Sequence, residues 1–184
     1  IKSSDRIYKF FKRIKSDHIE YNQYSGLKNN EVYKILNESN ILIDSLYSDS
    51  WGGTISSEAA AHGVIPVIGI VNLKNLKCFP KEIIPPYYLV QSDKFEKELT
   101  KLIFNKKLIF DFQKKCLDFS HNYNNPKNLG KRLLKIVNNE IQSSHYCNPL
   151  EISWVNNIAG NKKESQDKIK ILFKKKKIDL ENFP

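Results

Sequence analysis

The sequence contains little that could cross-link it or anchor it in a bilayer. Its three cysteines, Cys78, Cys116 and Cys147, are odd in number, widely separated and without the spacing of metal ligands. Neither a disulfide framework nor a zinc site is indicated, so a reducing cytosol is the expected compartment. No apolar run approaches the roughly 20 residues that a membrane-spanning helix needs. We therefore expect a cytoplasmic protein that is soluble or peripheral to a membrane.

Methionine is absent altogether, and the sequence starts at Ile1. Both features lead us to expect that an N-terminal part of the protein precedes this residue. The chain has 184 residues, 40% of them hydrophobic, with two Trp, nine Tyr and ten Phe. This is enough for one domain with a real core.

Acidic residues are fewer than basic ones: the sequence has 20 Asp and Glu and 30 Lys and Arg, which gives a net charge of +10. Such a charge attracts polyanions such as nucleic acid, anionic lipid or nucleotide phosphates. The abundance of Lys, Asn and Ile is also typical of an AT-rich genome. Specific nucleic-acid binding is disfavoured because no RNP, zinc-finger or helix-turn-helix pattern is present.

A glycine turn followed by a short helix is the most informative motif, and it lies within residues 48–63. Residues 41–46 before it and 64–71 after it each read as a short buried strand. The motif therefore belongs to a strand, turn, helix and strand unit, which is typical of a parallel sheet.

The residue types in this turn suit an anion. Gly52 and Gly53 can take backbone conformations closed to other residues and let a ligand approach the main chain, while Thr54 is predicted to cap the helix. Free N–H groups and the helix dipole then favour phosphate. Glu58 follows one turn later, where its carboxylate can accept two ribose hydroxyls. On spacing alone, a tight turn with a solvated Glu58 explains the motif equally well.

Residues 39–67 resemble the donor-binding segment of family-4 retaining glycosyltransferases of the GT-B fold. In that segment a strand with a polar end leads to a glycine, four residues, then Glu-Ala-x-Ala-x-Gly and a Pro-Val strand. The matching residues here are Gly53, Glu58 and Pro66-Val67. A looser likeness extends over residues 19–137.

The resemblance implies an α/β fold, with a Rossmann-like parallel sheet and helices on both faces. Residues 1–141 would be the C-terminal, donor-binding lobe of a GT-B enzyme, incomplete at its N-terminus, and residues 142–184 an extension. The implied reaction moves a hexose from a nucleoside-diphosphate sugar to a glycan, lipid or protein acceptor, without metal or cofactor. The lobe alone is not expected to turn over.

The implied donor-binding residues are Ser50, Gly52, Gly53, Thr54 and Glu58. One of them departs from the family pattern. A first glutamate commonly stands eight residues before the second and contacts the donor sugar or its phosphates, and that position is Ser50 here. The catalytic residues are left unassigned.

Apolar spacing predicts the remaining elements. We expect a helix over residues 5–15, a strand over 18–21 and a helix capped by Asn30. Residues 72–86 are too broken by lysines and prolines for a helix. A strand over 87–90 follows, then helices over 93–103 and 107–119 and one opening at Asn125-Pro126.

The C-terminal part suggests a membrane contact. Ile169, Leu172 and Phe173 fall on one helix face, and Lys174, Lys175, Lys176 and Lys177 follow them. A solvated last helix is one interpretation, and a basic anchor on the anionic inner face of a membrane is the other.

Two other functions remain open from the sequence. Asp49-Ser50-Gly52-Gly53 resembles a pattern of sugar-nucleotide epimerases of related GT-B architecture, but their glutamate follows the glycines one residue sooner than Glu58 does. A basic, non-enzymatic module that binds nucleic acid or anionic membrane is the second alternative.

Overall fold

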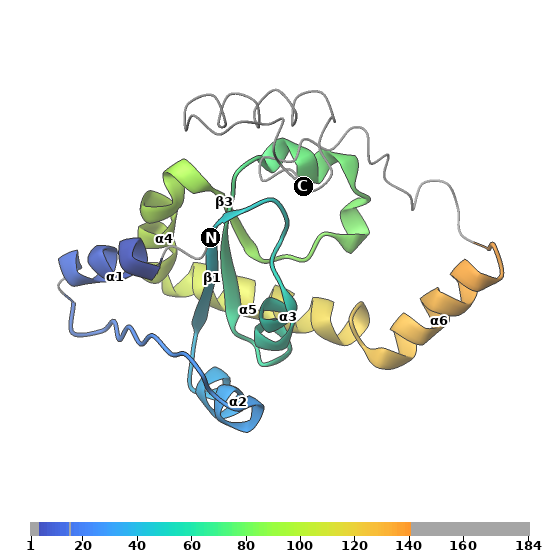
Figure 1. Cartoon of the computed structure of the whole chain (residues 1–184), viewed down its shortest axis with the longest axis horizontal. Coiled ribbons are helices and arrows are strands. Elements are labelled where there is room, and N and C mark those ends of the chain that lie inside the picture. The colour runs from blue at the N-terminus through green and yellow to red at the C-terminus, as the bar shows by residue number, and fades with distance from the viewer. Residues whose placement is uncertain (1–3, 15, 141–184) are drawn as a thin grey trace, which may run out of the picture.

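The computed structural model describes residues 4–14 and 16–140 of the chain (Figure 1). The expected extension over 142–184, including Lys174 to Lys177, lies outside the described residues. In chain order the helices and strands are α1 (Ser4–Arg13), α2 (Asn29–Asn37), β1 (Ile41–Ser48), α3 (Thr54–Ala61), β2 (Ile65–Ile70), β3 (Tyr88–Gln91), α4 (Phe95–Ile103), α5 (Lys106–Asn122) and α6 (Pro126–Val137).

The three strands form one parallel sheet in the order β1-β2-β3. β2 is the central strand, and every one of its residues is buried. Burial on both faces explains why this segment is apolar throughout rather than alternating. The strands predicted over residues 41–46, 64–71 and 87–90 are thereby confirmed within a few residues, and so is the parallel sheet.

Helices cover both faces of the sheet (Figure 1). On one face, α1 and α4 pack their buried residues against the strands; this cluster contains Ile7, Phe10, Leu46, Ile65, Val67, Val90, Phe95, Leu99 and Leu102. On the other face, Ala60 of α3 and Cys116 of α5 pack against Ile68 and Ile70. α2 joins that side through Leu36, which contacts Ala59 and Val64. The fold is thus α/β, consistent with a Rossmann-like architecture.

Two local predictions are wrong. Residues 18–21 form no strand, and the Tyr21 ring instead stacks on Phe11 of α1 with centroids 4.4 Å apart. α2 begins at Asn29, so Lys28 rather than Asn30 is its N-cap residue. The Glu31 carboxylate accepts a hydrogen bond from the Lys28 N–H at 2.8 Å, which supplies half of a capping box.

The segment between β2 and β3 has no α-helix, as predicted. It contains two short 3₁₀ helices, Leu73–Cys78 and Lys81–Ile83. The Asn72 side chain opens the first of them by accepting a hydrogen bond from the Lys74 N–H at 3.2 Å. This segment lies beside the glycine turn, because the Trp51 ring meets the Phe79 ring edge-on at 4.9 Å.

Candidate functional site

The predicted donor-site residues come together on one turn and the helix that follows it. Ser50, Gly52 and Gly53 lie in the connection between β1 and α3, and Thr54 and Glu58 lie on α3. This connection leaves the sheet at the carboxyl end of β1 (Figure 1). Ligands of parallel sheets bind at that edge, so the position suits a binding site.

Asp44 of β1 holds the glycine turn in place through hydrogen bonds to the turn and to the helix that follows it. Its Oδ2 accepts hydrogen bonds from the Gly53 N–H at 3.1 Å and from the Ser56 hydroxyl at 2.7 Å. The start of α3 therefore already has an anion beside it, supplied by the chain. The Gly53 N–H, which the sequence suggested as a free phosphate donor, is not free.

Asp44 is not among the predicted site residues, although the sequence contains one signal for it. It is the only acidic residue in an otherwise apolar and hydroxyl-bearing strand, Ile41–Ser48. A half-buried carboxylate in such a strand requires hydrogen-bond donors, and the nearest downstream donors are those of the glycine turn.

The two glycines of the turn have different requirements. Gly52 has a φ of +103°, and a Cβ built on it would lie 2.5 Å from Ile68 Cδ1 and 2.7 Å from Ser56 Oγ. Gly53 has a φ of −102°, which any residue can adopt, and its Cβ would come no closer than 3.9 Å to Asp44 Oδ2. The expectation that both need glycine for their conformation is correct for Gly52 and wrong for Gly53.

The N-cap of α3 is Gly53, not Thr54, which is the first helical residue. Thr54 therefore contributes its N–H to the first turn and no capping hydroxyl. The N–H groups of Thr54 and Ile55 donate to no acceptor among the residues that the structure describes. These two donors are what remains of the predicted anion site, because the Gly53 N–H donates to Asp44.

Glu58 lies on the side of α3 that faces away from the core. Thr54 and Glu58 are four positions apart and so share one face, with Cβ atoms about 5–6 Å apart. Thr54 is exposed, Glu58 is half-buried, and within the described ranges its carboxylate has no hydrogen-bond or ion-pair partner. The carboxylate is thus available to a ligand held at the Thr54 and Ile55 N–H groups.

The rest of α3 is fixed in place. Ser56, Ala59 and Ala60 are fully buried, so the small side chains let the helix pack closely. At its C-terminal end, the Gly63 N–H donates a hydrogen bond to the Ala60 carbonyl at 3.1 Å, and the Val64 N–H donates to the Ala59 carbonyl at 2.9 Å. Gly63 has a φ of +73°. This is a Schellman motif, and it confirms Gly63 as the residue that ends the helix.

Ser50 is exposed in the turn, and its N–H donates to the Ser48 hydroxyl at 3.2 Å. The resemblance expects a glutamate at this position, and Ser50 offers a hydroxyl instead. No group of three or more His, Cys, Asp or Glu side chains that could hold a metal occurs among the described residues.

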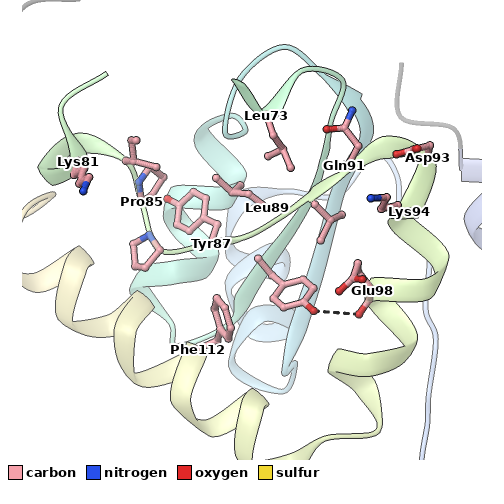
Figure 2. A pocket seen from close by; sticks show the side chains of 14 residues that line it. Leu73, Lys81, Pro85, Tyr87, Leu89, Gln91, Asp93, Lys94, Glu98 and Phe112 are labelled. Carbon is pink, nitrogen blue, oxygen red and sulfur yellow. Dashed lines mark hydrogen bonds between the residues drawn. The ribbon is translucent and has the colours of Figure 1, made fainter. Parts of the chain in front are cut away.

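A separate groove of about 890 Å³ runs along β3, the edge strand of the described sheet, and Figure 2 shows the side chains that line it. Tyr87 and Leu89 form one wall, Phe112 of α5 another, and the Tyr88 hydroxyl donates to the Glu98 carbonyl at 3.3 Å. Burial raises the pKa of both tyrosines, so both hydroxyls stay protonated at neutral pH. None of the predicted donor-site residues lines this groove.

Cys116 contacts the same region without being a reactive group. It is fully buried, its thiol lies 3.5 Å from the Pro86 carbonyl, and burial raises its pKa to about 12. A thiol with that pKa is not a nucleophile at neutral pH.

Comparison of the chain with protein-family models, with curated proteins and with solved structures finds no significant match. No helix in the described part of the chain is long and apolar enough to cross a membrane.

Proposed function

We propose that this chain is the nucleotide-sugar-binding lobe of a retaining glycosyltransferase of the GT-B fold. One observation supports the proposal above the others. At the carboxyl edge of a parallel sheet, the Thr54 and Ile55 N–H groups at the start of α3 lie about one turn before the Glu58 carboxylate, and neither these donors nor the carboxylate has a partner among the described residues. These are the groups needed to hold a diphosphate and a ribose one helical turn apart.

In this proposal the lobe acts on the leaving group. The Thr54 and Ile55 N–H groups hold the diphosphate as negative charge builds on it in the transition state. Asp44 is a positioning residue: it holds the turn through Gly53 and Ser56, and its charge confines the phosphates to the outer side of the helix start. The hexose goes to an acceptor bound on a second lobe.

Calorimetric titration of the full chain with UDP and with GDP tests the proposal. Binding of one nucleotide is expected, and Glu58→Gln should weaken it by about tenfold, because a charge-assisted hydrogen bond contributes on the order of 1–3 kcal/mol. Glu38→Gln is the matched control, since Glu38 is an exposed glutamate at the end of α2, away from the turn.

A second variant probes the phosphate position. Gly53→Val is compatible with the backbone and leaves the nearest neighbour 3.9 Å from the new Cβ, but it places a branched side chain beside the two donors. It should lower nucleotide affinity while the unfolding temperature falls only slightly. If neither nucleotide binds, or if both variants bind as the unchanged chain does, the site is not at this turn.

A further inference from the structure

Helix α6 has an apolar face that nothing in the described part of the chain covers. Of the six α-helices described, it is the one without a buried residue. It extends away from the sheet (Figure 1). Its large apolar side chains are exposed to 46% for Leu129, 54% for Leu133, 63% for Leu134, 50% for Ile136 and 77% for Val137.

The residues of α6 separate cleanly into two sides. With 3.6 residues per turn, Leu129, Leu133, Leu134, Ile136 and Val137 fall within an arc of about 160°, together with Pro126 and Gly130. The remaining arc holds Lys127, Asn128, Lys131, Arg132 and Lys135. Such a division is needed only if the two sides meet different surroundings.

The contacts of α6 show which side faces the protein. The Arg132 guanidinium lies 3.7 Å from the centroid of the Tyr123 ring, at the end of α5. The Asn128 side-chain amide donates to the Asn122 carbonyl at 2.8 Å. Both contacts come from the polar arc, so the body of the protein sits behind the polar side and the apolar arc is turned outward.

The charge of this region identifies the chemistry of its partner. α6 carries four basic residues and no acidic one, and no acidic residue occurs between Asp118 and Glu140. Lysine side chains are long enough to reach from the flanks of an embedded helix to lipid phosphates. An outward apolar arc with cations and no anions around it matches the surface of an anionic bilayer.

We propose that α6 is an interfacial helix that attaches the protein to anionic membranes, with its apolar arc in the acyl boundary and Lys127, Lys131 and Lys135 near the headgroups. The Arg132 and Asn128 side then faces away from the bilayer, toward the end of α5 and the rest of the protein. This attachment does not depend on the nucleotide site, and it is distinct from the Lys174 to Lys177 segment.

Vesicle co-sedimentation of the full chain tests the proposal. The chain should bind vesicles of equimolar phosphatidylcholine and phosphatidylserine and bind pure phosphatidylcholine far more weakly. Replacing both Leu133 and Val137 by Gln should lower the partition coefficient by about a hundredfold, since each buried apolar side chain contributes about tenfold. Replacing Lys131 and Lys135 by Gln should lower it about fivefold for each lysine at low salt and less at high salt.

Matched variants separate this helix from general charge effects. Lys107→Gln with Lys114→Gln removes two exposed charges from α5 and should have a much smaller effect. Replacing Lys174 to Lys177 by Gln tests the tail separately, and the α6 variants should still reduce binding in that background. Thermal unfolding of the Leu133 and Val137 variant should be nearly unchanged, because those side chains are 54% and 77% exposed and have little packing to lose.

Three results would overturn the proposal. The first is that the full chain binds neither kind of vesicle. The second is that the Leu133 and Val137 variant binds as well as the unchanged chain, with the binding lost only when the tail lysines are replaced. The third is a clear drop in the unfolding temperature of that variant, which would mean that another part of the folded protein covers the arc.

Discussion

Two amphipathic helices of this chain, α4 and α6, end up in opposite surroundings. α4 buries Phe95, Leu99 and Leu102 to an exposure of 1% or less, whereas α6 leaves Leu133 at 54%. Each has a one-sided apolar face, and α6 is the longer, with 12 residues against nine. Amphipathic spacing therefore predicts that one face of a helix is apolar, but it does not predict what packs against that face.

The polar sides of the two helices explain part of the difference. α4 carries Glu96, which binds Arg6 of α1 at 3.0 Å and Arg13 at 2.6 Å. These ion pairs join α4 to α1 across the same face of the sheet. α6 has no acidic residue with which to hold a basic neighbour, and its Arg132 and Asn128 contacts are with the end of the preceding helix.

The largest expected effect is at the centre of α4. Leu99→Ala should lower the free energy of unfolding by about 2–5 kcal/mol, because it leaves a cavity in a fully buried cluster. Leu133→Ala is the matched substitution in α6 and should change it by no more than about 0.5 kcal/mol. Urea denaturation of both variants measures the two values, and similar losses would remove the distinction between the helices.

A smaller effect is expected at the ion pairs of α4. Burial acts to raise the pKa of the Glu96 carboxyl, but hydrogen bonds from Arg6 and Arg13 outweigh it and hold the pKa below the ordinary value of 4.5. The stabilisation is therefore complete above pH 4.5 and is lost as the pH falls through the lower pKa of the folded state.

Glu96→Gln should accordingly cost about 1 kcal/mol at neutral pH, a modest value because the pairs are partly exposed. Unfolding temperatures measured from neutral to acidic pH should show the variant and the unchanged chain converging at low pH. Glu82→Gln, at an exposed site, is the control. A difference that stays constant with pH would assign the loss to packing rather than to charge.

The smallest expected effect concerns α6 itself. Gly130 lies in the middle of the helix, and an added Cβ would meet nothing within 4 Å. Gly130→Ala should therefore stabilise the helix by about 0.8 kcal/mol through propensity alone. Hydrogen exchange should show slower exchange of α6 amides with those of β2 unchanged, and protection rising equally in both would indicate that α6 folds with the core.

The candidate site shows a similar division between what the sequence reveals and what it does not. The glycine turn, the helix at residues 54–61 and the Gly63 terminus follow from residue types whose backbone preferences are local. Asp44 could not be assigned a role in that way, because its partners are nine and twelve residues further along the chain. Its effect on the site arises only when β1 and the turn are brought together.

Residues 18–21 show the converse error. His18-Ile19-Glu20-Tyr21 alternates like a strand, but a strand exists only where a neighbour pairs with it. In the fold the Tyr21 ring packs against Phe11 of α1 instead of against a neighbouring strand. Residues 18–21 pair with no strand of the described sheet.

The sequence by itself determined the elements that depend on local chemistry: a fully apolar β2, strands flanked by turn residues, and the helix ends at Asn125 and Gly63. Tertiary structure alone decided which apolar faces meet. It placed α4 against the sheet, left the apolar face of α6 outside, and set the Asp44 carboxylate at the start of α3. The reason is physical: backbone preferences are set within a few residues, whereas burial and hydrogen-bond satisfaction depend on segments that only the folded chain brings into contact.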